Sequence, residues 1–195
     1  MTYETVTLKS NPANVVMSED HKARLNELET LRTEIVSKYD GYTADQLTFK
    51  PEPGYWNLLQ VLDHIVTSEK MSAIYIKRQL NGKKYPPPPG LKSRFRYSLL
   101  KVALKLPFRY KAPSIVDSTG KTPDLHILQE SWKTIRGEIQ TIIETTDEEL
   151  LNLGVYEHPR AGLLNMEQAL DFLDMHIRHH KKQMERITGH ENFPG

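Results

Sequence analysis

Cysteine is absent from this 195-residue sequence. The absence excludes a disulfide framework, a cysteine nucleophile and any thiolate metal ligand. A metal site in this protein would therefore have to use histidine, carboxylate or water ligands. A reaction that needs a thiol would have to take it from a separate small molecule.

Long apolar runs and a strong net charge are also missing. No apolar stretch approaches the length of about 20 residues that a membrane-spanning helix needs. The N-terminus lacks a basic start followed by an apolar run. We therefore expect a cytoplasmic protein with no membrane span. The formal net charge of +1 gives no reason to expect nucleic acid binding.

Strand-forming blocks are missing as well, whereas apolar residues recur at helical spacing in several parts of the chain. The predicted helices cover residues of about 18–40, 57–80, 122–142 and 165–188. Ser18, Thr122-Pro123-Asp124 and Asn165 are typical helix starts, and Gly189 is a typical stop. Residues 147–151 could add one turn, and residues 154–162 are expected to be a loop.

These elements predict an all-α protein, a four-helix bundle with a long, basic, proline-containing crossover between the second and third helices. We expect a single domain over residues 1–195, with the bundle at about 18–188 and the crossover at about 81–121. Its prolines make a continuous element unfavourable, so only residues 92–106 could form a short helix.

The crossover lies in a stretch without acidic residues, between Glu69 and Asp117, that holds nearly half of the lysines and arginines. Apolar residues interleave with these bases, so the segment could be a basic amphipathic helix for a membrane surface, an anionic substrate or nucleic acid. The favoured interpretation is simpler. The apolar residues would pack on the bundle and the charges would be solvated.

Two histidines, His176 and His180, are four residues apart on the apolar side of the last predicted helix. A buried imidazole needs a partner, and one divalent metal ion satisfies both. A third ligand must come from another helix, and His64 lies at the border of the apolar stripe of the second helix. The alternative is that histidines near a helix end are favourable charges beside the C-terminal dipole.

That alternative explains the remaining histidines better. His179 is interpreted as such a charge. The others fall in helix starts, loops or tails, and we expect solvated or capping roles for them: His21, His126, His158 and His190. A cavity beside the three candidate ligands is predicted to be lined by Asn57, Ser68, Met71 and Gln183.

Two motifs together resemble a known family. Trp56 precedes a helix that carries Leu62-Asp63-His64-Ile65, and the last helix carries His176-x-x-x-His180-x-x-Gln183. These motifs, together with the segment from Glu157 to Gly162, resemble the DinB-like (YfiT-like) family of four-helix-bundle metal-dependent enzymes. The resemblance implies that His64, His176 and His180 bind a divalent ion such as zinc or nickel.

Three imidazole ligands leave a coordination position open to water or substrate, which is a catalytic arrangement. Two reactions follow, namely hydrolysis of a small molecule, or, by resemblance, transfer of a low-molecular-weight thiol activated as its thiolate. No side chain is assigned as the base, and the candidate reactive group is water at the three-histidine site. The alternative is a non-catalytic metal- or ligand-binding stress-response module. In either case we expect a homodimer.

Overall fold

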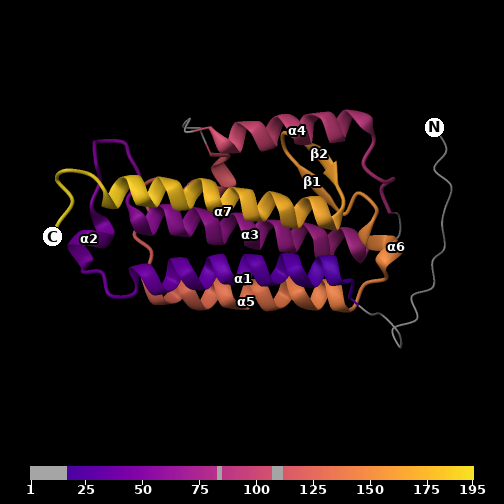
Figure 1. The fold of residues 1–195 in the computed structure, drawn as a ribbon, viewed down its shortest axis with the longest axis horizontal. Coiled ribbons are helices and arrows are strands. Elements are labelled where there is room, and N and C mark those ends of the chain that lie inside the picture. Colours follow the sequence, from indigo (N-terminus) through magenta and orange to yellow (C-terminus); the bar gives the residue numbers. More distant parts are fainter. Residues whose placement is uncertain (1–16, 83–84, 107–111) are drawn as a thin grey trace.

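The computed structural model describes residues 17–82, 85–106 and 112–195. Within these residues the chain is mostly helical, which confirms the predicted all-α four-helix bundle (Figure 1). The long bundle helices are α1 (Glu19–Tyr39), α3 (Leu58–Leu80), α5 (Leu125–Glu144) and α7 (Met166–Thr188). Shorter elements connect them: α2 (Ala44–Thr48), α4 (Leu91–Lys105), η2 (Ser114–Val116) and α6 (Glu148–Leu151).

Polar caps fix where the bundle helices begin. The Ser18 side chain accepts a hydrogen bond from the backbone of His21, as predicted for the start of α1. Asn57 and Asn165 each form a capping box with the glutamine three residues later. The cap of α5 is Asp124 rather than the predicted Thr122, because the Asp124 carboxylate accepts from Ile127 N.

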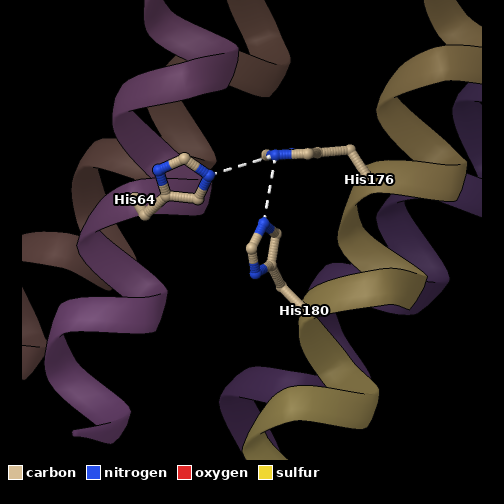
Figure 2. A group of neighbouring side chains, drawn as sticks. All are labelled: His64, His176 and His180. Carbon is tan, nitrogen blue, oxygen red and sulfur yellow. Dashed lines mark hydrogen bonds between the residues drawn. The ribbon is translucent and has the colours of Figure 1, made fainter. Parts of the chain in front are cut away.

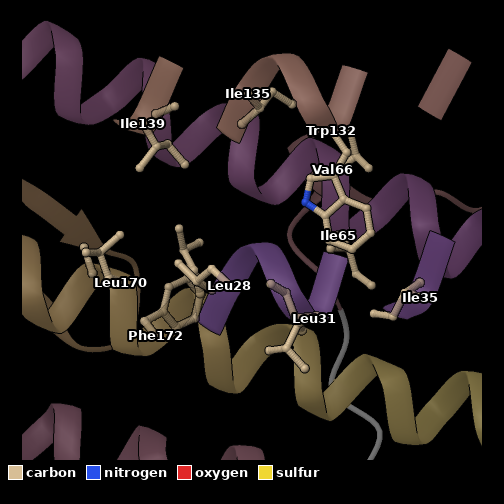
Figure 3. Packing of buried hydrophobic residues seen from close by; sticks show 14 of the residues in the cluster. Leu28, Leu31, Ile35, Ile65, Val66, Trp132, Ile135, Ile139, Leu170 and Phe172 are labelled. Carbon is tan, nitrogen blue, oxygen red and sulfur yellow. The ribbon is translucent and has the colours of Figure 1, made fainter. Parts of the chain in front are cut away.

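The four long helices form a closed ring. α3 packs against α5 and α7, and α1 packs against the same two helices on the other side. Their facing surfaces enclose one apolar core around Trp132, which is fully buried between Ile65 and Ile135 in the view of Figure 3. Each fully buried leucine, isoleucine or valine side chain in this core stabilises the fold by about 1.5–3 kcal/mol. The core therefore holds α3 and α7 in fixed register.

A β-hairpin corrects the predicted loop at residues 154–162 and the expectation of no strands. β1 (Tyr156–His158) pairs antiparallel with β2 (Gly162–Leu164). Strands of three residues are too short to show an alternating pattern in the sequence. Tertiary contacts hold the hairpin, since the Tyr156 and Ser72 hydroxyls lie 3.1 Å apart.

The crossover contains α4, which confirms the expected short helix and lies on the outside of the bundle over α7 and β2 (Figure 1). The favoured interpretation of this segment is wrong in one respect. Tyr97 is buried and Leu100 and Leu104 pack against the core, but most other large apolar side chains of α4 face solvent. Helical spacing predicts that an apolar stripe exists, not which side the bundle covers. No helix in the described parts of the chain is long and apolar enough to cross a bilayer.

Candidate metal centre

Three histidine side chains from two facing helices converge inside the bundle (Figure 2). His64 comes from α3, and His176 and His180 come from successive turns of α7. The Nε2 atoms of His64 and His176 are 3.1 Å apart, and those of His180 and His176 are 3.2 Å apart. All three rings are buried. Among the described residues, His64, His176 and His180 form the one cluster of side chains that could hold a metal ion.

Hydrogen bonds at Nδ1 fix the tautomers of two of these histidines. His64 Nδ1 lies 2.7 Å from the carbonyl oxygen of Val116, which can only accept, so Nδ1 donates. His180 Nδ1 donates to the side-chain oxygen of Gln183 at 2.8 Å. A neutral imidazole carries one proton, so the Nε2 atoms of His64 and His180 both present lone pairs. These two bonds also orient the rings.

The neutral form of each ring is favoured. Burial lowers the pKa of His64 and holds the pKa of His176 and His180 well below the ordinary range, and the neighbouring imidazoles lower the last two further. Metal ligation requires neutral imidazoles.

The donor set fits a cation. His176 Nε2 faces two lone pairs but carries at most one proton, which can serve only one of the two short contacts. A cation accepts all three lone pairs at once. Tetrahedral zinc is a familiar case of an ion held by histidine nitrogens. Nδ1 of His176 is buried without a hydrogen-bond partner among the described residues.

Aromatic side chains enclose the cluster. The ring of Trp56 packs 5.1 Å from the ring of His64, and its indole N–H donates to Thr119. Phe172 lies one turn before His176 on α7, with ring centroids 5.4 Å apart. Phe172 therefore packs against the one ring that has no hydrogen bond at Nδ1, and this contact orients His176.

The end of the crossover is tied to α3 beside the site. Asp63 accepts hydrogen bonds from the Ser118 hydroxyl at 2.5 Å and from Lys121 Nζ at 2.8 Å. Gln60 donates to the Lys121 carbonyl at 3.2 Å. The Asp63 carboxylate is therefore bonded to the end of the crossover. These bonds fix the segment that follows Val116, whose carbonyl contacts His64.

The other histidines differ from their expected roles to different degrees. His179 is not a charge at a helix end. It donates from Nδ1 to the Leu104 carbonyl at 2.9 Å, and burial lowers its pKa. His21 is buried rather than solvated and lies 3.5 Å from Glu148. His158 is half-buried, and desolvation lowers its pKa to about 4.

His158 and His190 accept hydrogen bonds from local backbone N–H groups, which agrees with the expected capping role. His158 Nδ1 accepts from the backbone N–H groups of Arg160 and Ala161, and the ring packs 4.5 Å from that of Phe172. His190 is half-buried against Phe49. His126 alone among the five is exposed, as expected.

The predicted pocket residues lie in different settings. Gln183 accepts the hydrogen bond from His180 Nδ1. The side-chain oxygen of Asn57 caps α3, where it accepts a hydrogen bond from Gln60 N at 2.8 Å. Ser68 and Met71 are half-buried on α3. Neither makes a side-chain hydrogen bond to the three histidines, within the part of the chain that is described. A cavity lined by these residues stays a prediction.

Sequence reasoning missed two neighbours of the site. Val116 acts through its backbone carbonyl, which no side-chain pattern signals. Phe172 could have been found, because it is four residues before His176 and so lies on the same face of the helix.

Comparison with known proteins adds evidence on the fold. No curated protein matches the chain. Among solved structures, the chain is similar to YfiT from Bacillus subtilis, which is described as a probable metal-dependent hydrolase with an unusual four-helix bundle topology. The TM-score is 0.61 at 17% sequence identity, over 94% of this chain and 93% of that one. The family model of the DinB superfamily matches residues 27–184, so the chain belongs to the DinB superfamily.

Proposed function

We propose that His64, His176 and His180 bind a divalent metal ion and that the protein is a metal-dependent hydrolase of a small molecule. The observation that carries the proposal is the convergence of three Nε2 atoms, two of which must present lone pairs. The description of the similar structure supports the reaction class. Zinc and nickel are among the divalent ions that imidazole donors suit.

The chain's own residues would prepare the site in two ways. Val116 and Gln183 hold His64 and His180 in the tautomer that a metal needs, and such second-shell bonds raise the basicity of the ligand nitrogen. The aromatic rings of Trp56 and Phe172 limit the access of bulk water. A bound divalent ion would supply Lewis acidity, polarising a substrate oxygen or sulfur and lowering the pKa of a coordinated water toward about 7.

Transfer of a low-molecular-weight thiol is the second candidate reaction. The same three imidazoles would serve it, and the sequence contains no cysteine that could supply the thiol internally. A non-catalytic metal- or ligand-binding module is the third possibility. It would need the same ligands, so only measurement of turnover separates it from an enzyme.

Metal analysis of purified protein tests the shared premise. We expect about one equivalent of zinc or nickel, lost in His64→Ala/His180→Ala and retained in His126→Ala, whose side chain is exposed on α5. A metal content that is negligible, or equal in all three proteins, would rule out the site.

Turnover then separates the reactions. The metal-loaded protein is screened with esters, amides, and a thiol together with an electrophile. Hydrolysis lost in His176→Ala supports the hydrolase, and activity that requires the added thiol supports the transferase. Stoichiometric metal without turnover of any substrate would favour the binding module.

A further inference from the structure

The outer face of α4 is apolar and is not covered by the bundle. Five side chains form it, and their exposed fractions are 85% for Leu91, 65% for Phe95, 55% for Leu99, 57% for Val102 and 40% for Leu106. At 100° per residue they fall within a sector of about 80°. We call these five residues the outer stripe. Among the described elements, α7 and β2 make the main contacts with α4, on the side opposite the outer stripe.

The helix is held firmly in this orientation. Tyr97, on the inner side of α4, is buried and its hydroxyl donates to the Asp171 carboxylate of α7 at 2.7 Å. Lys101 forms an ion pair with the same carboxylate. The Leu104 carbonyl accepts from His179. The outer stripe therefore faces solvent because the inner side is anchored.

Basic side chains border the outer stripe on both sides. Lys92 and Arg96 follow one edge of the stripe around the helix, and Arg94 and Lys105 follow the other. All four are exposed. No acidic residue occurs between Glu69 and Asp117, so α4 itself offers no acid to neutralise them.

We propose that the outer stripe of α4 docks on the surface of an anionic lipid bilayer. A helix with an apolar face and flanking lysines and arginines lies in the plane of such a surface, with its apolar side chains among the acyl chains and its bases at the phosphates. At 15 residues, α4 is about 22 Å long, enough to lie along the interface and too short to cross it.

The charges around the outer stripe argue against two other partners, a second copy of this chain and nucleic acid. If a second copy of this chain covered the outer stripe with its own, the bases that border each stripe would face one another without acids between them. Nucleic acid would neutralise the bases but leave the apolar side chains in water. An anionic bilayer satisfies both parts of the surface.

Flotation with vesicles tests the proposal. We expect the protein to bind vesicles of phosphatidylglycerol and phosphatidylcholine in equal parts, but not vesicles of phosphatidylcholine alone. Each base near an anionic surface strengthens binding about fivefold, so Lys92→Gln/Arg96→Gln should bind about 25-fold more weakly. Phe95→Ser/Leu99→Ser should lose about tenfold or more.

Matched controls change the same residue types elsewhere. Ile74→Ser/Ile127→Ser removes two exposed apolar side chains from α3 and α5, and Lys38→Gln/Lys133→Gln removes two exposed bases from α1 and α5. Both should bind as the wild type does. All altered side chains are exposed, and thermal unfolding of each variant confirms that it folds.

Three results would overturn the proposal. The first is no flotation with anionic vesicles at low salt, or equal flotation with both vesicle types. The second is a dimer in sedimentation equilibrium that Phe95→Ser/Leu99→Ser dissociates, which would assign the outer stripe to a second copy. The third is binding to duplex DNA that depends on Lys92 and Arg96 but not on Phe95 and Leu99.

Discussion

The substitution His176→Leu should change protein stability in opposite directions with and without metal. His176 is buried, and its Nδ1 has no hydrogen-bond partner among the described residues. A buried polar group without a partner costs about 1–3 kcal/mol. Leucine has a similar volume, and volume-conserving core changes cost less than about 1.5 kcal/mol. At Nε2, leucine removes one hydrogen bond and one contact between facing lone pairs, and these two changes offset each other. In a chelator, we therefore expect His176→Leu to be about 1 kcal/mol more stable than the wild type.

Metal should reverse this order. A ligand at about 100 times its dissociation constant stabilises the protein that binds it by about 2.7 kcal/mol. His176→Leu lacks one of the three ligands, so metal should add little to its stability. With metal, the wild type should therefore be more stable than His176→Leu by about 2 kcal/mol. For a chain of this size, about 1 kcal/mol corresponds to a shift of about 2–4 °C in the melting temperature.

Urea unfolding in chelator and in zinc or nickel measures both differences. His126→Leu replaces an exposed histidine and serves as the control for nonspecific binding of metal to imidazole. Our reasoning would be refuted if His176→Leu destabilised the chelated protein, or if metal stabilised the wild type and His176→Leu equally.

Other variants test the surroundings of the site and the hairpin. Gln183→Leu removes the acceptor for His180 Nδ1 and should weaken metal binding about 10- to 100-fold in a metal competition titration, while Gln183→Glu restores it. The pKa of His158 is about 4 in the folded protein and about 6.5 in the unfolded chain. Between pH 7 and pH 5 the unfolded chain binds a proton at this residue and the folded protein does not, so the free energy of unfolding should fall by about 2 kcal/mol. Urea midpoints of His158→Gln should depend less on pH, and an unchanged dependence would contradict this. Gly154→Ala should destabilise the protein, because the new Cβ would lie 2.9 Å from a backbone carbonyl oxygen of the crossover. Gly137→Ala has open space around it and should stabilise α5 by about 0.5–1 kcal/mol. Thermal unfolding of the two variants compares these effects.

The bundle and the histidine cluster could be predicted because both depend on local periodicity. A helical spacing repeated over some twenty residues is a strong signal, and it places His176 and His180 on one face whatever the rest of the chain does. His64 required a further assumption, that the second and last helices are neighbours. The contacts of α3 with α7 bear that assumption out.

The parts that could not be predicted depend on tertiary contacts alone. The hairpin strands are three residues long, so they carry no periodic signal. The burial of His21 and the partial burial of His158 follow from neighbours distant in sequence. The outward direction of the apolar side of α4 depends on the anchors Tyr97 and His179, which outweigh the tendency of leucine and phenylalanine to be buried.

The hydrogen bond from His64 to Val116 has a consequence for the order of folding. It joins residues 52 positions apart, and the contact between His64 and His176 joins residues 112 apart. Contacts between such distant segments form only after the intervening chain has closed into a loop, so they come late in folding. A helical hairpin or an isolated α7 could offer the pair His176 and His180, but not the third nitrogen. The complete trio therefore reports that the whole topology, including the end of the crossover, has assembled.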